Sequence, residues 1–242
     1  MRPAFTLVEM MAVVAMILVM TSLAGPAAHR LILQSQTNSA VHTFSGLVAG
    51  AQATAQSHFT TAAVRIERAF KTDEHGQMLK DHAGNALRLP RQQARILVFG
   101  MRQPDRPIGH EERAFRQLAH SGVTRLPREA WLAPDYALSL TFVAEELWRA
   151  PSAGVAPIST LDTFHVAFDR RGELVQVPAK QLIYLDETQG DLFAGHPYPS
   201  ARGAVVYRRA TFEDSGGDAA YLVNGRPLYI NRFTGCVVEG AR

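Results

Sequence analysis

The residue whose type and position carry the clearest chemistry is Glu9, an acidic residue inside a long apolar run. The 24 residues from Phe5 to Ala28 contain one ionisable side chain, which is that of Glu9. A carboxylate in a membrane helix costs about 2.5–3.5 kcal/mol at the bilayer centre, and less toward the edge. We therefore expect Glu9 to have a functional role and a partner that offsets this cost.

The apolar run is long enough to cross a bilayer as a helix. At about 1.5 Å per residue it would span roughly 36 Å, whereas the hydrocarbon core of a bilayer is about 30 Å thick. A secretory signal peptide has a shorter apolar region, with small residues at a cleavage site after it. In this chain the clearest small-residue junction, between Ala4 and Phe5, precedes the apolar run instead.

A cut at that junction would supply a partner for Glu9. It would give Phe5 a new α-ammonium group four residues, or about one helical turn, from the carboxylate. A neighbouring subunit displaced along a filament could present its own ammonium to Glu9, so the burial cost would be offset only when subunits dock in register. The alternative is a membrane anchor in which Glu9 is protonated or lies at the interface.

The motif Ala4-Phe5-Thr6-Leu7-Val8-Glu9, followed by apolar residues, resembles the prepilin processing motif of type IV pilins and type II secretion pseudopilins. The resemblance implies cleavage between Ala4 and Phe5, N-methylation of Phe5 and inter-subunit pairing by Glu9. The family usually has glycine before the cut, where this chain has Ala4. The leader, residues 1–4, has Arg2 as its one basic side chain.

A helix kink is expected at Gly25 and Pro26. Pro26 falls where helices of this family commonly carry a proline. A proline inside a helix removes a backbone hydrogen bond and favours a bend, and the neighbouring glycine weakens the helix further.

The transmembrane helix, residues 5–28, is expected to continue as an amphipathic helix over residues 29–58. Its apolar residues follow the three-and-four spacing of one helix face: Val41, Phe44, Leu47, Val48 and Ala51. No basic residue follows Arg30 in this stretch to favour a free helix on a membrane surface. We therefore expect the apolar stripe to lie against a β-sheet of the same chain.

Strand-like runs separated by turn residues predict a β-rich head over residues 59–242. The expected strands are residues 61–66, 94–101, 137–143, 163–168, 174–177, 181–185, 221–223, 228–230 and 236–238. Hairpin turns are expected at residues 169–172, at Asn224-Gly225 and at Thr234-Gly235. One long helix followed by runs of strands indicates an α+β fold, a pilin-like helix packed on an antiparallel β-sheet domain.

Three short patterns in the head resemble GspH/FimT-type minor pseudopilins. The passage from residues 53–56 to residues 63–66 is similar to their helix-to-first-strand junction. Residues 166–172 are similar to their central Phe-x-x-x-Gly hairpin, and residues 229–238 to their closing strand, Thr-Gly turn and strand. The single cysteine, Cys236, allows no intrachain disulfide. The paired cysteines of many major pilins are thus absent, which favours a minor or secretion-type subunit.

Elsewhere the sequence offers no catalytic constellation, and we interpret the chain as a non-enzyme without a cofactor. It has no Gly-x-Ser-x-Gly, phosphate loop, paired CxxC or zincin helix. Residues 73–75 and 81–82 combine Asp, Glu and His, but a solvated hairpin explains them better than a metal site. Residues 213–218 are acidic without the regular alternation of a calcium loop, which favours a polar turn.

A basic region over residues 88–128 raises a second function. It has nine arginines against three acidic residues, a local balance of +6 in a chain of net charge +3. Arginines can bind DNA phosphates without sequence preference, and some FimT-like minor pilins are associated with DNA uptake. The arginines that would carry this role are Arg102, Arg106, Arg113 and Arg116. The alternative is a scattered, solvated surface.

The sequence thus predicts a structural minor pilin or pseudopilin of a type II secretion pseudopilus or a type IV pilus. Its expected partners are other pilins, the prepilin peptidase and the inner-membrane assembly platform. It would be a single-pass protein of the bacterial inner membrane with its head in the periplasm, and would join a filament after assembly. Two alternatives remain at this point: a DNA-binding minor pilin and a plain membrane-anchored β-rich domain.

Overall fold

The structure is a computed structural model. It describes residues 7–71, 79, 82, 87–99, 115–118, 122–138, 163–177, 184–186, 190–193, 200–215 and 219–240.

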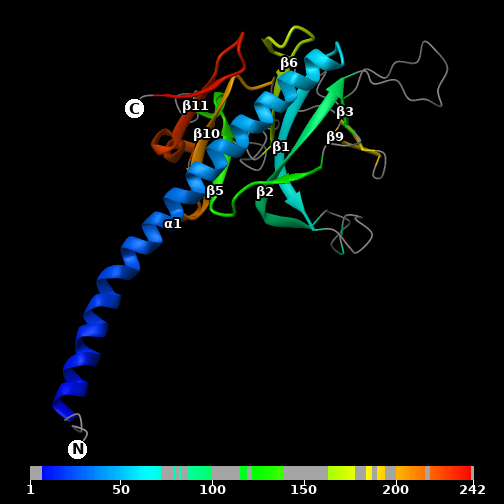
Figure 1. The fold of residues 1–242 in the computed structure, drawn as a ribbon. Helices are drawn as coiled ribbons and strands as arrows, with labels where there is room; N and C mark the ends of the chain where they lie inside the picture. The colour runs from blue at the N-terminus through cyan, green and yellow to red at the C-terminus, as the bar shows by residue number, and fades with distance from the viewer. Residues whose placement is uncertain are drawn as a thin grey trace, which may run out of the picture.

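A single helix, α1 (Leu7–Ser57, 51 residues), forms the N-terminal part of the structure. Figure 1 shows its first half projecting away from the β-strands, and its second half lying across them. The apolar side chains of the first half are exposed to the surroundings, whereas burial begins at Ala40. The same helix is therefore an uncovered rod at one end and part of the core at the other.

The C-terminal half of α1 buries the apolar stripe that its spacing predicts. Phe44, Val48 and Ala51 are fully buried, and Leu47 is 8% exposed. Burying one large apolar side chain contributes about 1.5–3 kcal/mol, so this stripe is the main attachment of α1 to the head. The prediction that it packs on a sheet of the same chain is confirmed.

The end of α1 is a Schellman motif with an unusual residue in it. The amide of Thr60 donates to the carbonyl of Ala55 (3.2 Å), and that of Phe59 donates to Gln56 (3.4 Å). Phe59 has a φ of 51°, in the left-handed region that glycine usually occupies at this position. The chain turns there directly into the first strand.

The larger β-sheet has eight strands, with β2 near its centre. Its order is β7-β6-β1-β2-β3-β8-β9, and β4 pairs with β2 off this path. Every pairing is antiparallel except that of β3 with β8. The strands are β1 (Ala62–Phe70), β2 (Arg88–Phe99), β3 (Phe115–Gln117), β4 (Thr124–Arg125), β6 (Phe164–Phe168), β7 (Leu174–Val175), β8 (Tyr184–Asp186) and β9 (Gly190–Phe193).

The smaller sheet has four antiparallel strands in the order β12-β11-β10-β5. They are β5 (Ala130–Pro134), β10 (Gly203–Arg208), β11 (Arg226–Ile230) and β12 (Val237–Glu239). A short helix, α3 (Arg209–Asp214), and a 3-10 helix, η3 (Ala219–Asn224), lie between β10 and β11 in the chain.

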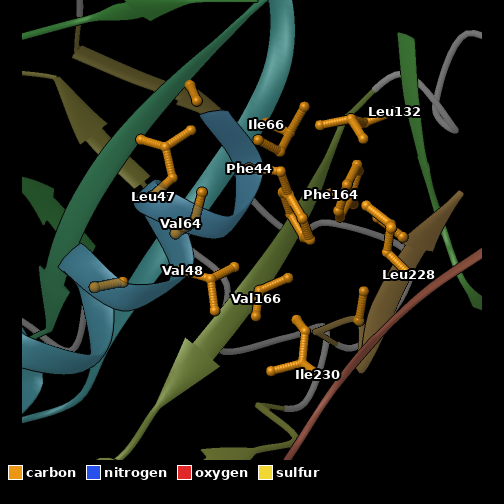
Figure 2. Close-up of a cluster of buried hydrophobic side chains, with 14 of the residues drawn as sticks. Phe44, Leu47, Val48, Val64, Ile66, Leu132, Phe164, Val166, Leu228 and Ile230 are labelled. Atoms are coloured by element: carbon orange, nitrogen blue, oxygen red, sulfur yellow. The ribbon is translucent and has the colours of Figure 1, made fainter. Parts of the chain in front are cut away.

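One apolar core joins the helix to both sheets. Figure 2 shows Phe44 of α1 surrounded by side chains of the larger sheet, such as Phe164, and of the smaller one, such as Leu132 and Leu228. All four side chains are at most 1% exposed. The head therefore consists of two sheets that α1 holds together, an α+β arrangement.

Several of the predicted strands are confirmed, but the strand predicted at residues 221–223 is wrong, and so is the start of the strand predicted at residues 137–143. The turn at residues 169–172 links β6 to β7, and the Thr234-Gly235 turn precedes β12, as expected. Residues 221–223 belong to η3 instead of a strand, because the chain there packs Leu222 against Tyr207 and Phe212. Residues 136–138 form a helical turn, and residues 139–143 lie outside the described residues.

Candidate functional site

The exposed half of α1 is the first candidate site. Its side chains form an apolar surface on every side of the helix, with exposed fractions from 49% at Val13 to 77% at Leu7. Among the described residues, α1 is the helix that is long and apolar enough to cross a membrane. A helix that is apolar all round needs lipid or other apolar helices around it.

Glu9 lies in the first turn of α1 and is its one acidic residue there. Its neighbours Val8, Met10 and Met11 are all more than half exposed. The free N–H groups at a helix N-terminus favour a negative charge in the first turn. The first turn of α1 is therefore a favourable position for the carboxylate of Glu9. Ala4 and Phe5, the residues of the predicted cleavage and methylation site, lie outside the described residues.

The helix continues without interruption through Gly25 and Pro26, where the sequence predicts a kink. Proline has no N–H, so the carbonyl of Ser22, four residues earlier, receives no helical hydrogen bond from it. Gly25 has no atom of the chain near the position of a β-carbon. This pair is thus the weakest part of the helix by composition, and it lies in the exposed half.

The arginines predicted to bind DNA are not brought together by the described residues. Arg102, Arg106 and Arg113 lie outside them. Arg116 lies in β3 and is only 9% exposed, because it sits inside the larger sheet opposite Val98. Its guanidinium is therefore packed into the head, and is not part of an open surface that a nucleic acid could reach.

Comparisons with protein-family models, with curated proteins and with solved structures find no match to this chain.

The far end of α1 holds two loops of the head, a role that sequence reasoning missed. The side-chain amide of Gln52 donates to the carbonyl of Gly172 (2.8 Å), and that of Gln56 donates to Arg171 (3.1 Å). A β-carbon at Gly172 would lie 2.3 Å from Gln56, and one at Gly235 would lie 2.4 Å from Gln52. The two hairpin turns therefore close onto α1 only because both residues are glycine.

Sequence reasoning also missed a buried charge network on the face of the larger sheet that is opposite α1. The side chain of Glu67 is 2% exposed. Its carboxylate forms ion pairs with the Nε of Arg65 (2.7 Å) and the Nε of Arg95 (3.1 Å). Gln93 donates to the same carboxylate at 3.0 Å. Neighbouring strands bring these side chains together, and their polar alternation with Val64 and Ile66 is the sequence signal that could have revealed a two-sided strand. Because a buried carboxylate needs such partners, we assign the network a structural role.

Asp135 is a carboxyl group whose pKa the fold raises. It follows β5 and accepts a hydrogen bond from the amide of Arg202 (3.1 Å). Burial raises the pKa of Asp135 above its usual value of 3.8, and hydrogen bonds from nearby amides, that of Arg202 foremost, lower it in part. This carboxylate lies where β5 ends and β10 begins, so its charge affects the junction within the smaller sheet.

Proposed function

We propose that this chain is a minor pilin-like subunit that joins a filament through α1. The observation that carries the proposal is one unbroken helix with two different halves. Its first half exposes an apolar surface with Glu9 in the first turn, and its second half is buried in the head. A rod of this kind suits a filament whose core is a bundle of such helices and whose outer layer is the heads.

The role of Glu9 follows from its surroundings in that bundle. Packed among apolar helices, its carboxylate would lose water and would need a positive partner. Cleavage after Ala4 would create an α-ammonium on Phe5, about 6 Å along the helix from Glu9. In a filament, the ammonium of a neighbouring subunit would pair with Glu9 only at the correct axial displacement. The resemblance of residues 4–9 to the prepilin motif implies the prepilin peptidase, other pilins and an inner-membrane assembly platform as partners.

The fold is compatible with a GspH/FimT-type pseudopilin of a secretion pseudopilus or with a type IV pilin. In either system the chain would lie in the inner membrane by one helix, with the head in the periplasm, before it enters the filament. The proposed role of Glu9 is the same in both systems, and so is its test.

The DNA-uptake alternative has less support from the described residues. Of its four arginines the described part of the chain includes Arg116, which is buried. The membrane-anchor alternative shares the exposed helix but requires neither cleavage after Ala4 nor pairing by Glu9. Experiments on these two properties therefore distinguish it from the pilin-like subunit.

The test replaces Glu9 by glutamine in the full chain, in a host that assembles such filaments with the partner pilins. Glu173→Gln is the matched control, because it removes one carboxylate on the head, where Glu173 pairs loosely with Arg232 at 3.7 Å. We expect Glu9→Gln to be processed normally but to fall at least tenfold in the sheared filament fraction, while Glu173→Gln enters it like the native chain. Equal incorporation of both variants would contradict the role of Glu9.

A further inference from the structure

A cationic cavity lies where α1 leaves the head. It has a volume of about 600 Å³ and combines one face of α1 with the end of β10, η3 and the start of β11. Its lining residues are Arg30, Gln34, Thr37, Val206, Tyr207, Arg208, Thr211, Tyr221, Asn224, Gly225 and Arg226. No part of the proposed filament function uses this cavity.

The cavity carries three guanidinium groups, and none of its described lining residues is acidic. Arg226 is fixed in place, because its Nε donates to the carboxylate of Glu239 and its Nη1 donates to Oδ1 of Asn38 (2.8 Å). Arg30 and Arg208 are exposed, and neither forms an ion pair with a carboxylate of the described residues. Two positive charges therefore remain for a ligand.

The other lining groups suit a phosphate with polar substituents. Gln34 and Asn224 contribute side-chain amides, and Thr211 contributes an exposed hydroxyl. Guanidinium groups bind phosphate oxygens through charge-assisted and often bidentate hydrogen bonds. The chemistry of the lining thus indicates a small anionic group that carries hydrogen-bonding oxygens.

The position of the cavity along α1 indicates where that group comes from. If the apolar run through Ala28 crosses the bilayer, Arg30 lies about 3 Å beyond its end and Gln34 about 9 Å beyond it. The headgroup layer of a bilayer extends about 5–8 Å beyond the hydrocarbon on each side. Arg30 therefore lies at the level of the lipid phosphates, and Gln34 lies at the outer edge of that layer. Tyr221, half-buried in the wall, is a residue type enriched at this interface.

We propose that the cavity binds the headgroup of an anionic phospholipid from the leaflet on the side of the head. Arg30 and Arg208 bind the phosphate, and Arg226, whose charge is paired with Glu239, forms part of the polar wall of the cavity. The bound lipid fixes the rotation and depth of the head at the membrane before any assembly. The proposal rests on α1 crossing the bilayer and is independent of cleavage after Ala4 and of pairing by Glu9.

The test uses the full chain in nanodiscs of phosphatidylglycerol mixed with phosphatidylcholine. The variant is Arg30→Gln with Arg208→Gln. The matched control is Arg170→Gln with Arg171→Gln, which removes the same two charges from exposed positions on the turn held by the far end of α1. Native mass spectrometry after release from the nanodisc counts the phosphatidylglycerol molecules retained per chain, and circular dichroism checks that each variant is folded.

We expect the native chain and the control to retain phosphatidylglycerol in preference to phosphatidylcholine. In the cavity variant this preference should be about 10- to 30-fold lower than in the native chain. Equal retention by the cavity variant and the native chain would overturn the proposal, as would an equal loss in the control. A separate titration of the detergent-solubilised chain with inorganic phosphate distinguishes the source of the anion. Binding of inorganic phosphate without preference for phosphatidylglycerol would overturn the assignment to a lipid.

Discussion

The side chain of Gln92 and the backbone of Leu132 exchange two hydrogen bonds in the centre of the head. The side-chain Nε2 of Gln92 donates to the backbone carbonyl of Leu132 (2.8 Å), and the backbone N–H of Leu132 donates to Oε1 of Gln92 (2.7 Å). Gln92 belongs to β2 of the larger sheet and Leu132 to β5 of the smaller one. Both residues are fully buried, so this pair is a polar link between two sheets in an apolar core.

Replacing Gln92 by leucine should destabilise the head strongly. The substitution leaves the N–H and the C=O of Leu132 buried without these partners, and each such group costs about 1–3 kcal/mol. We expect the free energy of unfolding to fall by about 2–5 kcal/mol, measured by denaturant unfolding of the full chain in detergent with circular dichroism. Gln176→Leu, at an exposed position, should change it by less than about 0.5 kcal/mol. A similar small change for Gln92→Leu would show that the link has no energetic role.

The glycines at the two hairpin turns should not tolerate a side chain. Gly172 has a φ of 80° and Gly235 a φ of 63°, both in the left-handed region. Alanine at either position would cost about 1–2 kcal/mol in backbone strain and would also displace Gln56 or Gln52. Thermal unfolding of Gly172→Ala and Gly235→Ala should therefore show lower midpoints than the native chain.

Gly46→Ala is the matched control for this pair. Gly46 lies in the interior of α1 with no atom near the position of a β-carbon. Alanine there should stabilise the helix by up to about 1 kcal/mol, because glycine is a poor helix former. Equal effects of the three substitutions would contradict the role assigned to the turns.

Asp135 should make the stability of the head depend on pH at the acidic end. Because the pKa of Asp135 is raised in the folded state, the folded protein binds more protons than the unfolded one between 3.8 and the raised value. The contribution of Asp135 to stability therefore falls as pH rises through this window, and the cost of its charge is fully present above it.

Asp135→Asn keeps an oxygen that can accept from the amide of Arg202 but removes the charge. The unfolding free energy of the native chain minus that of Asp135→Asn should therefore fall as pH rises above 3.8, and then become constant. Denaturant unfolding at a series of pH values measures this difference. A difference that is independent of pH, or that shifts the other way, would contradict the assignment.

The helix and two turns could be predicted from the sequence because their signals are local. The spacing of Phe44, Leu47 and Val48 specifies a buried face of α1, and the glycines of the turns at 169–172 and 234–235 specify left-handed backbone. The 3-10 helix η3 could not be predicted, because Asn224-Gly225 after apolar residues also fits a hairpin. Its conformation depends on packing against Tyr207 and Phe212, which is a tertiary effect.

The sites that depend on distant residues could not be found from sequence either. Gln92 is 40 residues from Leu132. Arg30, near the start of the chain, lines the same cavity as Arg226, near its end. No local pattern marks these partners, since each is an ordinary polar residue in its own segment. The motif around Glu9 is the opposite case, because its chemistry is visible within a few residues of sequence.

The most direct test of the proposed function is the mass of the N-terminal peptide after co-expression of the full chain with a prepilin peptidase. The proposal predicts a peptide that begins at N-methylated Phe5, both in the native chain and in Glu9→Gln. A peptide that retains residues 1–4, in cells where the peptidase cleaves a control substrate, would contradict the pilin-like assignment and favour a plain membrane-anchored domain.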